Sequence, residues 1–197
     1  MGILYLVRHG LTEQNSKFLL SGRVDHLLND EGKMQAATLR DRFEEQGIVF
    51  DKVYSSPLAR AVETAEIIAG GSVITDERLI EMDYGPYEGM DLHSPAPELI
   101  LFFSDFVNNP APEGMEPLDE VTARMGNFLE AIKEEVLHGN VLIATHAIAM
   151  KGALEYLTPQ SGGSYWSKNI HNCEAYCTEF KDGKYAVPQR AFPREGS

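Results

Sequence analysis

Residues 3–10 read Ile-Leu-Tyr-Leu-Val-Arg-His-Gly, and this stretch decides the fold of the chain. Its five consecutive apolar residues predict a strand buried on both faces, as in the interior of a parallel sheet. The strand ends directly at Arg8 and His9. Because ligands of open α/β sheets bind outside the carboxyl ends of the strands, these two residues are expected beside a ligand.

Helical and strand-like segments alternate along the rest of the chain. We expect helices over residues 30–46, 57–69, 118–137 and 147–157, and strands over 49–54, 72–75, 140–145, 175–180 and 185–187. Asn29 and Ser56 stand where helix N-caps are expected, and Asp182-Gly183 predicts a tight hairpin. The alternation favours an α/β fold: a three-layer α/β/α sandwich with a mostly parallel central sheet.

Residues 84–117 interrupt this alternation. They contain five prolines before a sixth at Pro117, together with an apolar patch over residues 99–106. We interpret the segment as a small cap inserted over a ligand site. Residues 1–187 are then a single domain that includes the cap, and residues 188–197 are expected to be a loose C-terminal tail.

The charge balance limits the classes of partner. The 197 residues include 17 Lys and Arg against 30 Asp and Glu, a net charge of −13. Such an acidic chain is expected to bind neither nucleic acid nor an anionic membrane. The expected partner is a small phosphorylated metabolite, which would need cationic side chains gathered in one pocket. The sequence leaves open whether the chain forms a homodimer. Without a signal-peptide pattern, and with only Cys173 and Cys177, a cytoplasmic location is expected.

Two arginines and a histidine form the first part of a candidate site. Neutral imidazole is a nucleophile near pH 7, so His9 could form a covalent intermediate. The guanidinium group of Arg8 could then bind phosphoryl oxygens. Arg60 lies near a predicted helix N-terminus, where free amides favour anions.

A second histidine and a carboxylate complete the set. His146 follows the strand at 140–145 and could, when protonated, donate a hydrogen bond to a phosphoryl oxygen. Glu81 lies between Ile80 and Met82, and partial desolvation can keep a carboxyl group protonated for use as a general acid. Asp83 and Glu88 are alternatives for that role.

Taken together, these segments resemble the histidine phosphatase superfamily, the phosphoglycerate mutase-like proteins. Arg8 to Asn15 is similar to the family's opening signature, and Thr145-His146 to its second histidine segment. Further similarity lies at residues 22–25, Leu28, Gly32, Gln35, Ala36, residues 55–65, residues 81–89, Gly114, Glu116 and Arg124. These matching segments, taken in order, span about residues 3–180. Ala147 and Ile148 depart from the pattern, since many members carry smaller residues there, often glycine.

The resemblance implies a phosphohistidine mechanism on the family's fold. His9 would be phosphorylated, with Arg8, Arg60 and His146 holding the phosphoryl oxygens and Glu81 serving as acid and then base. The implied substrate-binding residues are Asn15, Ser21, Gly22 and Ala147. No metal and no other cofactor is expected, because the cationic side chains would supply the charge stabilisation.

The family contains both phosphatases and mutases. A phosphoglycerate mutase must hold a second anionic group, yet no Lys or Arg occurs between Arg78 and Arg124. We therefore expect a phosphatase that acts on a small phosphomonoester with an apolar or neutral leaving group. A mutase-type isomerase is the alternative, and a non-catalytic phosphate-binding protein is a third hypothesis.

Overall fold

The computed structural model describes residues 2–193. Within that range the chain forms a seven-stranded mixed sheet with the order β3-β2-β4-β1-β5-β6, in which β7 also pairs with β5. Its strands are β1 (Gly2–Arg8), β2 (Lys52–Ser55), β3 (Ile74–Thr75), β4 (Val141–Thr145), β5 (Ala175–Lys181), β6 (Lys184–Tyr185) and β7 (Gln189–Arg190). The parallel pairs are β1 with β4, β4 with β2, and β2 with β3. Strand β5 runs antiparallel to β1, β6 and β7.

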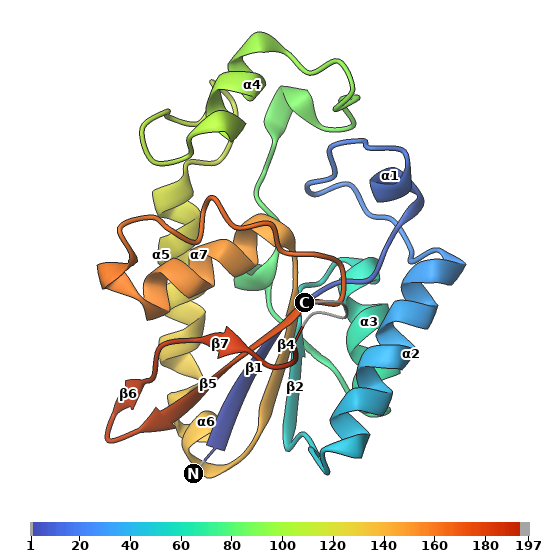
Figure 1. Cartoon of the computed structure of the whole chain (residues 1–197), viewed down its shortest axis with the longest axis vertical. Coiled ribbons are helices and arrows are strands. Elements are labelled where there is room, and N and C mark those ends of the chain that lie inside the picture. The colour runs from blue at the N-terminus through green and yellow to red at the C-terminus, as the bar shows by residue number, and fades with distance from the viewer. Residues whose placement is uncertain (1, 194–197) are drawn as a thin grey trace.

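Helices cover both faces of the sheet (Figure 1). α2 (Asp30–Glu45) and α3 (Ala59–Ala69) pack on one face, and α5 (Leu118–Ala131), α6 (Lys133–His138) and α7 (Ala147–Leu157) on the other. The pleat divides the side chains of β1: Leu4 and Leu6 join the core beneath α5 and α7, while Tyr5 and Val7 join that beneath α2 and α3. The predicted three-layer α/β/α fold is therefore confirmed.

Shorter elements lie at the edges of this framework. They are α1 (Glu13–Ser16), α4 (Pro97–Ser104) and the 3-10 turns η1 (Glu77–Leu79), η2 (Gly85–Tyr87) and η3 (Pro159–Ser161). α4 belongs to the segment interpreted as a cap. It lies at the opposite end of the molecule from the start of β1, beyond the carboxyl ends of the strands (Figure 1). Leu99 and Phe102 of α4 are buried in the core shared with α5 and α7.

Several boundaries differ from the expectations. Asn29 caps α2 as predicted, accepting a hydrogen bond from the Gly32 amide at 2.8 Å. Ser56 is not the N-cap of α3, because Leu58 is still extended (φ −70°, ψ 134°) and the helix begins at Ala59. The Ser56 hydroxyl contacts His146 at 2.7 Å and accepts from the Leu58 amide at 3.3 Å. The helix expected over 118–137 is divided at Ile132, where φ is −101°.

The expected loose tail needs a correction for residues 189–192. Gln189 and Arg190 form β7 against β5, and Phe192 is buried, with its ring 5.0 Å from that of Phe43. Backbone pairing and apolar burial thus hold this stretch on the sheet. Residues 194–197 lie outside the described residues. No helix in residues 2–193 is both long and apolar enough to cross a membrane.

Candidate active site

The carboxyl ends of three parallel strands bring the candidate residues together. Arg8 pairs with Thr145 across β1 and β4, and Ser55 pairs with Ala144 across β2 and β4. The residue after each strand therefore lies at the same edge of the sheet. There the ring centroids of His9 and His146 are 5.1 Å apart. The structure thus places side by side two imidazoles that are 137 positions apart in sequence (146 − 9).

The geometry of His9 fixes its tautomer. Its Nδ1 lies 2.7 Å from the carbonyl oxygen of Gly10, which only accepts hydrogen bonds, so Nδ1 carries the proton. Nε2 then holds a free lone pair. Burial, followed by the positive charges of Arg8 and Arg60, keeps the pKa of His9 well below its ordinary value of 6.5. The ring is therefore neutral near pH 7 and has the form that a nucleophile needs.

His146 has the opposite tautomer. Arg60 Nε, which can only donate, lies 3.3 Å from His146 Nδ1, so the proton of this ring is on Nε2. Nε2 donates to the Ser56 hydroxyl at 2.7 Å. Burial and then the charge of Arg60 hold the pKa of His146 well below 6.5. His146 is thus a neutral donor, which corrects the expectation that it donates as a protonated ring.

Arg60 is buried and Arg8 is half-buried, and backbone oxygens hold both. Arg60, 0% exposed, donates from Nη2 to the Gly22 carbonyl at 2.6 Å and from Nη1 to that of Val24 at 3.0 Å. Arg8 donates from Nη1 to the Ile170 carbonyl at 2.6 Å. The Nε of Arg8 is buried without a partner among the described residues. Two fixed cations beside the imidazoles suit a dianionic phosphoryl group.

Glu81 is fastened to the N-terminus of α7. Its Oε1 accepts from the amides of Met82 at 2.9 Å and Ala149 at 3.0 Å, and its Oε2 from Ile148 at 3.2 Å. The side chain is 3% exposed. The alternatives are differently engaged, since Asp83 pairs with Arg23 and Glu88 accepts from the amide of Gly22. Of the three carboxylates, only Glu81 joins α7 directly behind His146.

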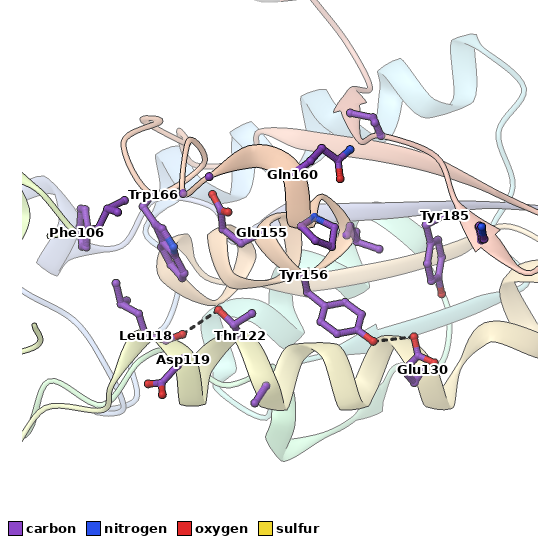
Figure 2. Close-up of a pocket in the computed structure, with 18 of the residues that line it drawn as sticks. Phe106, Leu118, Asp119, Thr122, Glu130, Glu155, Tyr156, Gln160, Trp166 and Tyr185 are labelled. Carbon is purple, nitrogen blue, oxygen red and sulfur yellow. Dashed lines mark hydrogen bonds between the residues drawn. The ribbon is translucent and has the colours of Figure 1, made fainter.

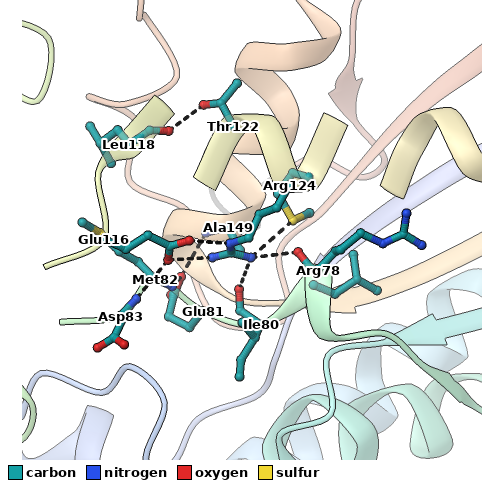
Figure 3. A network of polar contacts seen from close by, with 12 residues as sticks. Arg78, Ile80, Glu81, Met82, Asp83, Glu116, Leu118, Thr122, Arg124 and Ala149 are labelled. Atoms are coloured by element: carbon teal, nitrogen blue, oxygen red, sulfur yellow. Dashed lines mark hydrogen bonds and ion pairs between the residues drawn. The ribbon is translucent and has the colours of Figure 1, made fainter. Parts of the chain in front are cut away.

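The ion pair between Arg124 and Glu116 forms a brace that holds the segment carrying Glu81 in place (Figure 3). Arg124 Nη1 donates to the carbonyls of Arg78 and Ile80 at 2.8 and 2.6 Å. Arg124 Nε pairs with Glu116 at 2.7 Å, and Glu116 accepts from the Asp83 amide at 3.1 Å. These contacts hold the backbone on both sides of Glu81. They also give a physical reason for the Gly-x-Glu…Arg pattern at residues 114–124.

The residues predicted to bind substrate surround this cluster. The Ser21 hydroxyl is buried without a partner among residues 2–193. Gly22 must be glycine, because a Cβ there would lie 2.8 Å from the Tyr84 ring and 2.9 Å from the Met82 carbonyl oxygen. Asn15 closes the capping box of α1, and Ala147 is the first residue of α7, ahead of the two amides, of Ile148 and Ala149, that donate to Glu81.

Sequence reasoning missed several supporting side chains. Asn172 donates to the His9 carbonyl at 2.9 Å and lies 3.4 Å from the Asn15 side-chain oxygen. Thr64 accepts from the Gly10 amide at 3.0 Å, and Gln35 from the Leu11 amide at 3.0 Å. Thr64 and Gln35 lie in segments that resemble the family. Asn172 had no such signal, because only the fold brings it to His9.

A large cavity lies elsewhere. It has a volume of about 1130 Å³ and opens between α5, α7 and the β6 hairpin, where Tyr156 points towards Glu130 (Figure 2). None of the five candidate catalytic residues lines it. Size alone therefore does not identify the site of chemistry, which is defined by the strand ends.

Comparison with known proteins shows the family to which the chain belongs. The family model of the histidine phosphatase superfamily (branch 1) matches residues 4–191. The chain belongs to this superfamily, and it is a phosphatase, a hydrolase. A Hydrogenobacter thermophilus protein that bears the name phosphoserine phosphatase 2 is 35% identical over 182 residues, 89% of this chain and 87% of that protein.

Two further matches show the range of relatives. An Escherichia coli O1:K1 / APEC protein that bears the name phosphoglycerate mutase GpmB is 34% identical over 154 residues, 75% of this chain and 70% of that protein. The crystal structure of Entamoeba histolytica phosphoserine phosphatase with 3-phosphoglyceric acid superposes with a TM-score of 0.81 at 25% identity, covering 95% of both chains.

Proposed function

We propose that the chain hydrolyses a small phosphomonoester through a phosphohistidine intermediate on His9. The observation that carries the proposal is the pair of opposite tautomers. The Nε2 of His9 is a free lone pair, while the adjacent His146 is a fixed donor and Arg8 and Arg60 are fixed cations. A nucleophile surrounded by donors is the arrangement that phosphoryl transfer needs.

The first step forms a bond between His9 Nε2 and phosphorus and breaks the bond from phosphorus to the leaving oxygen. Glu81 gives its proton to that oxygen, so an alcohol departs. We assign the proton to Oε2, because Oε1 already accepts two amides and Oε2 only one, at 3.2 Å. Arg8 and Arg60 hold the phosphoryl oxygens, and His146 Nε2–H joins them when a phosphoryl oxygen replaces the Ser56 hydroxyl as its acceptor. Asn15, Ser21, Gly22 and Ala147 lie around them.

The second step returns the enzyme to its starting state. A water oxygen attacks phosphorus, the bond to His9 Nε2 breaks, and Glu81 takes the proton of the water. Phosphate leaves with the same His9 tautomer restored. No step requires a metal, because the charge on the phosphoryl group is balanced by the two arginines.

The relatives bearing phosphoserine phosphatase names make O-phosphoserine a natural first substrate to test. We do not propose a mutase. Arg78 is paired with Asp76, and Arg124 with Glu116, so neither arginine flanking the cap is free to hold a second phosphate. Release of phosphate from 3-phosphoglycerate without conversion to its 2-isomer would agree with this choice.

A direct test compares His9→Ala with His138→Ala, an exposed histidine of α6. With p-nitrophenyl phosphate, His9→Ala should lose about 10³-fold or more of kcat, because no nucleophile remains. The His138 variant and chelator-treated wild type should keep full activity, and vanadate should inhibit. Activity that survives in His9→Ala, or disappears with chelator, would refute the proposal.

A further inference from the structure

Lys151 is a buried cation that the proposed mechanism does not use. It lies in α7 and is 9% exposed. Its Nζ donates to the Trp166 carbonyl at 2.8 Å and lies 4.9 Å from the ring centroid of Phe106. None of the ion pairs in the described part of the chain involves it. An ammonium has three N–H donors, and burying one with a single neutral oxygen is costly unless an anion completes the site.

A second cavity, of about 500 Å³, opens at this lysine. Its polar lining consists of Lys151, Lys168, Ser164, Ser167, Asn169, Ser104 and Asp105. Asp105 is not among the charges that act on Lys151; its carboxylate instead accepts from the amides of Val107 and Asn108 and from the Asn108 side chain, at 2.7–3.1 Å. Phe106 and Trp166 separate this cavity from the larger one, since both residues line each of them.

The second cavity adjoins the phosphoryl site. Lys151 follows Ala147 by four residues, so the two lie one above the other on the same face of α7. Asn169, which lines the cavity, precedes Ile170, whose carbonyl holds Arg8. The charges of Glu81 and Arg8 both act on Lys151. Burial lowers the pKa of Lys151 to about 8, so the ammonium form still dominates at pH 7.

We propose that this cavity receives the leaving group and that Lys151 binds a carboxylate on it. The inference rests on the proposed function and refines its substrate class to phosphomonoesters of a hydroxy acid. A single ammonium with two spare donors matches a monoanionic carboxylate, whereas a second phosphate dianion calls for a guanidinium fork. The sequence analysis expected a neutral leaving group from the cap alone, but this cation comes from α7.

The test compares O-phosphoserine with O-phosphoethanolamine, which differs by lacking the carboxylate. Lys151→Gln keeps a donor for the Trp166 carbonyl, and Lys151→Arg keeps the charge. Lys151→Gln should raise KM for phosphoserine about tenfold or more, since a charge-assisted hydrogen bond is lost, and leave KM for phosphoethanolamine within about twofold. Lys151→Arg should recover most of the loss. Lys184→Gln, an exposed lysine of β6, should change neither KM.

The outcomes separate the subsite from the proposed function. Equal KM changes for both substrates would show a structural role of Lys151 and overturn the subsite. A wild type that does not prefer phosphoserine, while still hydrolysing p-nitrophenyl phosphate through His9, would overturn the subsite alone. If Lys151→Gln loses p-nitrophenyl phosphate turnover as well, Lys151 is needed for the fold, and Lys151→Arg then decides whether charge selects the carboxylate. Turnover that does not need His9 would overturn both.

Discussion

The phosphoryl side of the site and its leaving-group side are built in different ways. On the phosphoryl side, His9 and His146 directly follow strands whose register is fixed by backbone pairing. On the leaving-group side, Glu81 belongs to a loop that side chains hold in place, through Arg124, Glu116 and the first turn of α7. The proposed nucleophile thus depends on the sheet, and the proposed acid depends on a polar network.

This difference in support indicates which part of the site can vary in sequence without disturbing the fold. Strand ends give a nucleophile and its oxyanion donors the rigid placement that catalysis requires. Loops and a cap next to them can change the leaving-group subsite without disturbing the sheet. We therefore expect substitutions on the phosphoryl side to abolish turnover of every substrate, and substitutions on the other side to act selectively.

The largest effect is expected for Arg60→Lys. A lysine has no planar fork with which to hold His146 Nδ1 and the carbonyls of Gly22 and Val24 together. We expect kcat to fall about 10³-fold for p-nitrophenyl phosphate and phosphoserine alike. Steady-state kinetics measure this fall in kcat, with exposed Arg190→Lys of β7 as the control. A loss limited to one substrate would contradict the division between the two sides.

The next effect concerns Glu81→Gln, which removes the proposed proton donor. Hydrolysis of phosphoserine should slow about 10²-fold, because its alkoxide needs protonation, whereas p-nitrophenolate leaves readily without it. Pre-steady-state rates of the first step measure the contrast for the two substrates. Equal slowing for both substrates would argue against Glu81 as the general acid and would make Asp83 and Glu88 the candidates for that role.

A smaller effect is expected for Glu116→Gln, which removes the ion pair of the Arg124–Glu116 brace but leaves the candidate catalytic residues unchanged. The half-buried guanidinium of Arg124 loses its ion pair, and Arg23 loses one of its two, so the free energy of unfolding should fall by about 2–3 kcal/mol and kcat by about tenfold. Asp83→Asn breaks the exposed pair with Arg23 and should cost at most about 0.5 kcal/mol. Urea unfolding compares them. Similar losses for both variants would show that the brace is no more important than a surface pair.

The smallest effect per residue is a pH dependence of stability. His9 and His146 have folded pKa values well below 6.5, so the unfolded chain takes up protons on them first as the pH falls. Their contribution is present above pH 6.5 and is lost on acidification, by about 1.4 kcal/mol per histidine and pH unit. Urea unfolding at pH 7.5 and 5.5 should show a smaller loss for His146→Gln than for wild type. A loss that His138→Gln reduces equally would contradict burial as the cause.

The sequence predicted the phosphoryl side better than the leaving-group side. A buried strand that ends in Arg8-His9 and a second that ends at His146 must meet at one edge of a parallel sheet, so local patterns were sufficient. The tautomers could not be predicted, because they depend on the Gly10 carbonyl and on Arg60. Ser56 was misread as an N-cap for the same reason, since its partner lies 90 residues away.

The leaving-group side depends on contacts between distant segments. Lys151 is an unremarkable helix residue in the sequence, and its burial follows from Phe106 and Trp166, which lie 45 positions before and 15 positions after it. The tail was misjudged because the pairing of β7 with β5 and the burial of Phe192 are likewise non-local. Patterns within one segment cannot show which other segment will cover it.

The central claim is tested most directly by trapping the phosphoryl group on the enzyme. Glu81→Gln, in which the second step is slowed, is mixed with p-nitrophenyl phosphate, quenched in alkali and digested for mass spectrometry. We predict one phosphorylated peptide, modified at His9 and labile in acid, and no such peptide from His9→Ala. A phosphoryl group on any other residue, or repeated turnover with none on His9, would contradict the account.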